Sequence, residues 1–304
     1  MPQLVLRLDK FINDTKPLGK WVPNLKGFMV GNGVTNWKYD CDPAYFHMAY
    51  YHGLISDELV NAVQANNCDF SYIDAPQPPP LSPICATLFD KFLNLTSLVN
   101  VYDVFGKCWK NPSAFKANKM ARELSDSPQL ENEGLTAAKY TSFLKSSKRT
   151  ILKDTPPCVY SKSIIDYFTD PLVLAQLNIV KESPKWDLCA DVSVFNYTSA
   201  QNASQWIYPI VKGRYKILKY SGDTDGAVPT YGTQQWINEL NWPILEAWRP
   251  YYIQNMYGTQ VAGYVEKRDG LLFVTVHGAG HMAPQWKKQE TYHAVFNFIN
   301  NKPL

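Results

Sequence analysis

Residues 220–225, Tyr-Ser-Gly-Asp-Thr-Asp, and residues 278–284, Gly-Ala-Gly-His-Met-Ala-Pro, decide the interpretation of this 304-residue chain. Each stretch follows an apolar run of strand length, at 215–220 and at 271–276. Asp225 and His281 are therefore expected on loops that follow two strands. An imidazole base oriented by a carboxylate makes up two-thirds of a nucleophile–base–orienter triad.

Further strands and helices are predicted around these loops. Residues 261–267 and 271–276 flank Arg-Asp-Gly, and an Asp-Gly pair accepts the positive φ angles of a tight hairpin. Residues 24–33 predict a short buried strand that ends in a Gly/Asn turn. Helices are expected at 44–52, from Ser56 onward and after Pro284. A helix at the start of the chain would place Leu4, Leu8, Phe11 and Ile12 on one apolar face. The last helix would place Val295, Phe298 and Ile299 on one face.

Composition excludes several classes of protein. The chain is 45% apolar and 19% charged, which is typical of a globular protein with a substantial core. A net charge of +3 is too small to indicate nucleic acid as a partner. No apolar run approaches the length of a membrane span.

Cysteines and glycosylation sequons indicate an oxidising compartment. The six cysteines include no Cys-x-x-Cys pair and none has a neighbouring His, so disulfides are a better interpretation than a metal site. Asn-x-Ser/Thr sequons occur at Asn13, Asn94, Asn196 and Asn202. The first ten residues, in contrast, do not have the layout of a signal peptide, and they suggest that the chain opens inside a helix.

The middle of the chain differs from its two ends. Residues 66–157 contain five prolines between 76 and 83 and, further on, a basic segment that has no clear strand pattern. We expect a cap insertion there, with a core formed by residues 1–65 and 158–304. The basic segment is either a solvated face or a rim that attracts substrate.

The possible triad has alternatives at two of its positions. His277 and His281 have the i, i+4 spacing of a helical metal pair, but the intervening glycines make a helix improbable, so no metal site is expected. Asp223 and Asp225 compete as orienter; Gly222 and the Val-Pro at 228–229 favour Asp225, which leaves Asp223 to bond backbone amides within its loop. The chain order matches the Ser…Asp…His order of α/β-hydrolases. No Gly-x-Ser-x-Gly nucleophile motif occurs anywhere in the 304 residues.

Several motifs, taken in order along the chain, resemble those of the serine carboxypeptidases, an α/β-hydrolase family. They are residues 25–32 (Leu-Lys-Gly-Phe-Met-Val-Gly-Asn), 52–59 (His-Gly-Leu-Ile-Ser-Asp-Glu-Leu), 157–158 (Pro-Cys), 186–189 (Trp-x-x-Cys), 220–225, 261–264 (Val-Ala-Gly-Tyr) and 278–284. The resemblance implies the C-terminal portion of an α/β-hydrolase fold with a helical, disulfide-stapled cap. It implies Asp225 as the triad Asp, His281 as the general base and Met282 on the leaving-group side.

The resemblance also implies how the cysteines pair. Cys68 would pair with Cys85, and Cys108 with Cys158. Cys189 normally pairs with a cysteine of a family motif that this sequence does not contain, and Cys41 has no family counterpart, so both are expected to be unpaired. The substrates would be peptide or protein C-termini. No cofactor is implied, and the setting would be a lysosome-like or vacuolar lumen or the secreted space.

One further expectation concerns the nucleophile. The family's Gly-Glu-Ser-Tyr-Ala-Gly normally lies shortly before a Val-Pro-Gln-Leu stretch, which the first four residues resemble. The sequence therefore predicts an N-terminally truncated form that is inert toward peptides. A non-enzymatic binding relative, an acyltransferase of the wider family, and a homodimer stay open as alternatives.

Overall fold

The computed structural model describes residues 1–106, 162–180, 182–186 and 200–304. The chain divides into two compact units. The first comprises Met1–Thr96, Val101–Val104 and Ser199–Leu304, and the second comprises Ser97–Asn100 and Phe105–Thr198.

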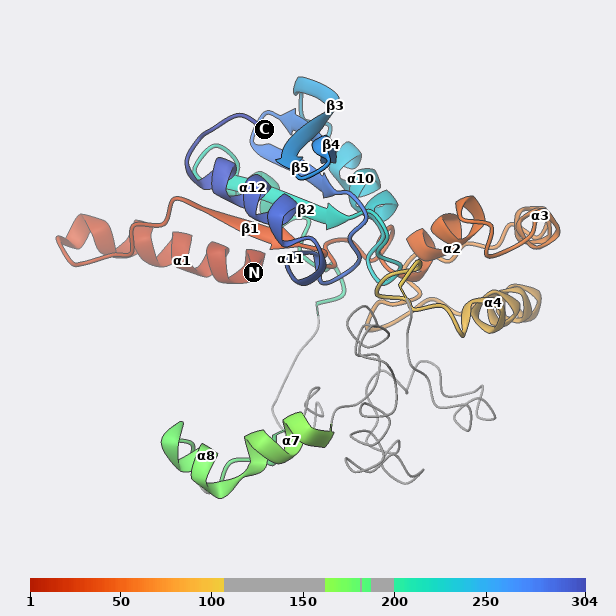
Figure 1. The fold of residues 1–304 in the computed structure, drawn as a ribbon, viewed down its shortest axis with the longest axis horizontal. Coiled ribbons are helices and arrows are strands. Elements are labelled where there is room, and N and C mark those ends of the chain that lie inside the picture. Colours follow the sequence, from red (N-terminus) through yellow and green to blue (C-terminus); the bar gives the residue numbers. More distant parts are fainter. Residues whose placement is uncertain (107–161, 181, 187–199) are drawn as a thin grey trace. The chain divides into compact units, whose positions relative to one another are not determined.

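The first unit is built on a five-stranded sheet with the order β1-β2-β5-β4-β3 (Figure 1). Strands β1 (Gly27–Gly31), β2 (Lys216–Gly222) and β5 (Leu271–Val276) run parallel. Strands β4 (Gly258–Arg268) and β3 (Ile244–Asn255) complete the sheet in antiparallel pairing. The β4–β5 hairpin turns at Gly270, whose φ of 103° confirms the Asp-Gly prediction.

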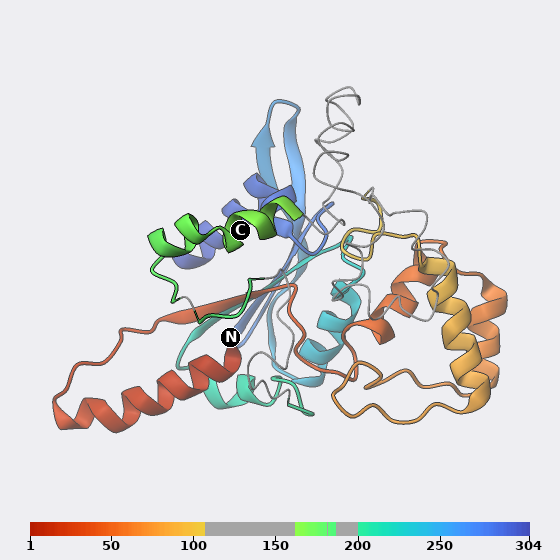
Figure 2. The ribbon, with the colours of Figure 1, turned by 90° about the horizontal axis from the view of Figure 1, so that it is seen from below.

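Helices cover both faces of this sheet, as Figures 1 and 2 show. On one face, α1 (Pro2–Thr15), α9 (Ile207–Val211) and α10 (Thr230–Glu239) pack against β2 and β5. On the other face, α12 (Lys288–Ile299), which follows the short helix α11 (Ala283–Trp286), packs against β2, β4 and β5. Strand β2 is buried on both faces, as expected for a parallel strand inside an α/β sheet.

The predicted apolar face of the first helix is confirmed only in part, because Leu8 and Ile12 are half-buried while Leu4 and Phe11 are exposed. Helix α1 buries Val5 and Asp9, whereas Leu4 is 55% exposed and Phe11 45% exposed. On the buried face, Val5 packs in the core, and Asp9 forms an ion pair with Arg214 at 2.6 Å and accepts a hydrogen bond from Tyr215 at 2.9 Å. A single-turn 3₁₀ helix, Lys16–Leu18, follows.

A helical cluster continues the same unit. Helices α2 (Asp42–Tyr51), α3 (Asp57–Ala65) and α4 (Pro83–Thr96) share a core that includes Leu59 and Phe92. The predicted start of α3 at Ser56 is confirmed, and Ser56 caps this helix because its Oγ accepts from the Leu59 amide. Residues 66–96 thus belong to the unit that holds the sheet, although the sequence placed them in the insertion. A disulfide joins Cys68 to Cys85 within this cluster, as the resemblance implies.

In the second unit, the structure describes helices α7 (Lys162–Thr169) and α8 (Pro171–Gln176). Asp170 caps α8 by accepting the Leu172 amide at 2.7 Å. The ring of Phe168 lies 4.8 Å from that of Trp186, measured between centroids.

Candidate active site

The loops after β2 and β5 meet in contact with each other. Gly222 ends β2, and a Cβ at this position would collide with the carbonyl oxygens of Ala279 and Gly280. The Thr224 amide donates to the Ala279 carbonyl at 2.9 Å. The absence of a side chain at Gly222 therefore allows the Asp loop and the His loop to approach each other closely.

This approach joins Asp225 to His281. Asp225 Oδ2 lies 2.9 Å from His281 Nδ1, and the Asp225 side chain is completely buried while that of His281 is 32% exposed. An ionised carboxylate only accepts hydrogen bonds, so Nδ1 is the donor in this pair, and in a neutral imidazole Nε2 is then the nitrogen that can accept a proton. The pair thus has the geometry of an oriented base.

Asn32, on the loop after β1, also forms a hydrogen bond with the Asp225 carboxylate. Its Nδ2 donates to Asp225 Oδ2 at 2.7 Å, and its Oδ1 accepts from the Gly222 amide at 3.2 Å. The Ala227 amide donates to the other carboxylate oxygen at 2.8 Å. Sequence reasoning placed Asn32 only in a tight turn. Its φ of 43° agrees with that turn, but the turn alone gave no sign that the side chain reaches Asp225.

Residues 101–104 hold both loops through their backbone. The Val101 carbonyl accepts from the Gly226 amide at 2.8 Å, and the Tyr102 carbonyl accepts from the His281 amide at 2.7 Å. The Val104 amide donates to the Thr224 carbonyl at 3.0 Å. The Tyr102 ring also lies 5.5 Å from the His281 imidazole, measured between centroids. This segment was predicted to be part of the insertion, and nothing local in its sequence indicates its contact with the site.

Asp223 has a role of its own in the structure. One carboxylate oxygen accepts from the Gly278 amide at 2.7 Å, and the other lies 2.7 Å from His277 Nδ1. Asp223 therefore bonds a backbone amide, but in the opposite loop and not in its own. The two Asp–His pairs are separate, so Asp223 does not orient His281.

Behind the site, Lys219 is completely buried on β2. Its Nζ donates to the Gly33 carbonyl at 2.5 Å and to Thr35 Oγ1 at 3.4 Å, close to Asn32 in the chain. Burial lowers the pKa of Lys219 to about 8, and the nearby carboxylates of Asp40 and Asp225 limit that drop. Burial also raises the pKa of Asp40, which accepts from the backbone amides of Thr35 and Asn36.

The remaining predicted residues fall into three groups. Met282 directly follows His281 and is partly buried at the start of α11. Cys41 is a free thiol whose pKa burial raises, and Asn13, Asn94 and Asn202 are exposed. The residues that lie outside the described part of the chain are Cys108, Cys158, Cys189 and Asn196.

The described residues contain no cluster of three or more His, Cys, Asp or Glu side chains that could hold a metal ion. In the same part of the chain, no helix is both long and apolar enough to cross a bilayer.

A mixed sheet with helices on both faces, and with Asp and His loops after neighbouring parallel strands, defines an α/β-hydrolase type of fold. The family model of the serine carboxypeptidases matches residues 2–301. The chain belongs to the serine carboxypeptidase family.

Individual relatives agree with this assignment. Serine carboxypeptidase ctsa-4.1 of Caenorhabditis elegans is 28% identical, with 99% of this chain and 61% of the relative covered. The lysosomal protective protein of Mus musculus is 26% identical, with 92% and 59% covered. The crystal structure of Kex1Δp, a prohormone-processing carboxypeptidase from Saccharomyces cerevisiae, matches with a TM-score of 0.58 at 19% identity, with 96% and 58% covered. The chain thus spans about three-fifths of the length of the curated relatives it matches.

Proposed function

We propose that this chain carries the base and the orienting carboxylate of a serine carboxypeptidase, which releases C-terminal residues from peptides. The hydrogen bond between His281 and Asp225, in a chain of this family, is the observation that carries the proposal. In this role His281 Nε2 takes the proton of the attacking hydroxyl and returns it to the leaving amine. Asp225 holds the tautomer and stabilises the imidazolium that forms.

The nucleophile in this proposal is a serine outside the 304 residues. The absence of a Gly-x-Ser-x-Gly motif from the sequence supports this, as does the greater length of the relatives. Without the serine and its oxyanion donors, a preserved base supplies only a small part of the stabilisation that the transition state needs. We therefore expect the isolated chain to be inert toward peptides.

Compartment and substrate contacts belong to the same proposal. The Cys68–Cys85 disulfide and the exposed sequons support a secretory-pathway setting, and one relative is named as lysosomal. Met282, next to the base, would line the side on which the leaving residue sits. The partner is the C-terminus of a peptide or protein, bound by a monomer or a homodimer.

The test compares the 304-residue chain with a longer form. The coding sequence immediately before Met1 is read for an in-frame Gly-Glu-Ser-Tyr-Ala-Gly, and both forms are assayed on an N-blocked dipeptide. We expect activity only from the longer form, with loss of about 10³-fold or more in kcat when His281 is replaced by Ala. Robust activity from the 304 residues alone, or a longer form that does not respond to His281→Ala, would refute the proposal.

A further inference from the structure

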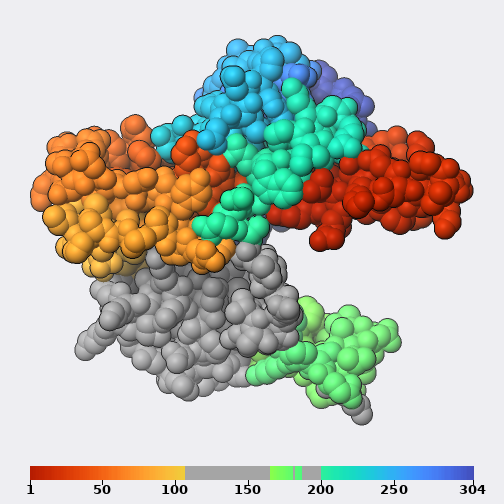
Figure 3. All heavy atoms as spheres, turned by 180° about the vertical axis from the view of Figure 1, so that it is seen from behind, coloured from red at the N-terminus to blue at the C-terminus, as the bar shows by residue number. Residues whose placement is uncertain are grey.

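A pocket in the first unit lies away from the Asp225–His281 pair. It is a cavity of about 400 Å³ beside α9 and the end of α10, within the size range of small-ligand pockets. The space-filling view shows the turquoise segment around α9 at the surface, between the red of α1 and the orange of the α2–α4 region (Figure 3). The aromatic side chains in its lining are Trp37, Tyr72 and Trp206.

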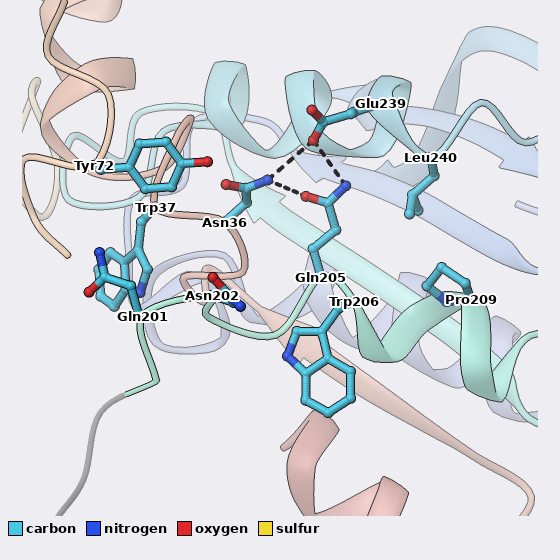
Figure 4. A pocket seen from close by; sticks show the side chains of 10 residues that line it. All are labelled: Asn36, Trp37, Tyr72, Gln201, Asn202, Gln205, Trp206, Pro209, Glu239 and Leu240. Atoms are coloured by element: carbon cyan, nitrogen blue, oxygen red, sulfur yellow. Dashed lines mark hydrogen bonds between the residues drawn. The ribbon is translucent and has the colours of Figure 1, made fainter. Parts of the chain in front are cut away.

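The polar side chains of this pocket are largely bonded to one another or to the backbone (Figure 4). Asn36 Nδ2 donates to Gln205 and to Glu239, and Gln205 Nε2 also donates to Glu239, at 3.1 Å. The side-chain amide of Gln201 accepts from the backbone N–H of Gln77 at 3.0 Å and donates to its carbonyl at 3.1 Å. The pocket therefore has a fixed polar wall that leaves few donors for a freely diffusing polar ligand.

Its aromatic surfaces, in contrast, are open. Trp206 is 48% exposed and Tyr72 39% exposed. The indole N–H of Trp37 donates to the Ala200 carbonyl at 3.1 Å, which fixes that ring in the pocket wall. Exposed aromatic rings offer flat apolar faces, and the C–H face of a sugar ring is a suitable partner for them.

A sequon opens into the same pocket. Asn202, the acceptor of Asn202-Ala203-Ser204, is exposed and lines the cavity, and Figure 4 draws its side chain between Trp37 and Trp206. Ala203 has a φ of 45°, so the sequon turns sharply at its central residue. Ser204 is buried in the folded chain, which is compatible with transfer of a glycan before the segment folds.

We propose that Asn202 carries an N-linked glycan whose first sugars pack in this pocket against Trp206. The inference rests on the secretory setting of the proposed function. Asn202 Nδ2 would form a bond to the anomeric carbon of a lipid-linked oligosaccharide and lose one proton, and the lipid pyrophosphate would leave. A tethered glycan is present at a high effective concentration, so stacking alone can hold it where a free sugar would bind too weakly.

The test measures how accessible each glycan is in the folded protein. The full chain is produced behind a cleavable secretory leader in a host that leaves N-glycans as oligomannose. The native protein is then treated with an endoglycosidase, and each site is followed by peptide mass spectrometry. We expect the Asn202 glycan to be released at least about fivefold more slowly than the Asn13 glycan, because a stacking contact must first break.

Matched variants separate packing from other causes. Trp206→Ala should remove the delay at Asn202, whereas Trp21→Ala, at an 81% exposed tryptophan outside the pocket, should leave it unchanged. In urea-unfolded protein all sites should be cleaved at one rate. The inference is overturned if Asn202 is unoccupied, or if its release rate is the same before and after Trp206→Ala. Occupancy at Asn13 with none at Asn202 would sink this inference alone and leave the secretory setting intact.

Discussion

His281 Nδ1 lies 2.9 Å from Asp225 Oδ2, and Asn32 Nδ2 lies 2.7 Å from the same oxygen. One buried carboxylate oxygen thus receives two hydrogen bonds, one from the base and one from an amide on a different strand's loop. The orientation of the His281 imidazole depends on this oxygen of Asp225. Substitutions at Asp225 and at Asn32 should therefore have measurable effects.

Replacing Asp225 with Asn should change the tautomer of His281. An Asn side chain can present an amide donor to Nδ1, and the imidazole would then carry its proton on Nε2. In a form that contains the serine, the same change should lower kcat by about 10⁴-fold. The ¹⁵N chemical shifts of the imidazole report the tautomer directly, without any need for activity.

Asp223→Asn is the control for this experiment, because Asp223 contacts His277 and not His281. It should alter the His277 signals alone. A His281 tautomer that responds to Asp223→Asn but not to Asp225→Asn would contradict the assignment of the orienter.

The Asn32 amide should contribute measurably to stability. Asn32→Gly keeps the left-handed backbone available but removes hydrogen bonds to Asp225 and to the Gly222 amide. We expect the free energy of unfolding in urea to fall by roughly 2–3 kcal/mol, the usual cost of losing a hydrogen bond to a charged group. Asn67→Gly is the matched control, since Asn67 has a similar φ of 49° and is exposed. Equal losses at the two positions would show that backbone entropy explains the effect.

Lys219 should make stability increase with pH. Its folded pKa of about 8 lies below the value of 10.5 expected when the chain is unfolded. Between these two values the unfolded state binds more protons than the folded state, so the free energy of unfolding rises with pH. Well below pH 8, Lys219 is protonated in both the folded and the unfolded state. The folded state then carries the full free-energy cost of burying its charge.

The measurement is urea unfolding of the wild type and of Lys219→Met at intervals from about pH 7 to 10, a range that brackets the folded pKa. The difference between the two proteins cancels the titration of the tyrosines, and wild type should gain roughly 2–3 kcal/mol relative to the variant across this range. A difference that stays constant with pH would show that Lys219 keeps its ordinary protonation in the folded state.

The disulfide between Cys68 and Cys85 should stabilise the helical cluster of α2, α3 and α4. It closes a loop with a sequence separation of 17 residues, for which loss of loop entropy in the unfolded chain is worth roughly 3 kcal/mol. The double variant Cys68→Ala, Cys85→Ala should therefore unfold at lower urea concentration. Dithiothreitol should lower the stability of wild type by at least as much as the double substitution does, and any further loss in the variant would come from the Cys108–Cys158 pair that the resemblance implies. A double variant as stable as wild type would contradict the prediction.

Much of the fold could be predicted from local sequence patterns. The apolar runs at β2 and β5, the Asp-Gly turn between β4 and β5, and the Ser56 cap all follow from rules that operate within a few residues. The long edge strand β3 was missed because Pro250 interrupts its pattern, and proline is tolerated in a sheet at an edge such as the one β3 forms.

The residues of the candidate site also divide into those that local sequence patterns could predict and those that they could not. Asp225 and His281 could be chosen from their flanking residues, and Asp223 could be set aside on the same grounds. The roles of Asn32, of Lys219 and of the backbone at 101–104 could not, because each depends on contacts between segments that are far apart in the chain. For Lys219 there was one local signal: it lies in the middle of the apolar run of β2, where a buried charge needs a partner elsewhere.

By itself, the sequence determined the family, the strands β1, β2, β4 and β5, and the Asp and His residues that follow β2 and β5, because these depend on residue types at fixed spacing. Only the tertiary structure decided which carboxylate oxygen the base meets, what else bonds to that oxygen, and which face of α1 is buried. These features depend on where distant segments of the chain come to lie when the sheet assembles. A hydrogen bond forms only within a narrow range of distance and angle, and the spacing of residues along the chain does not specify that geometry.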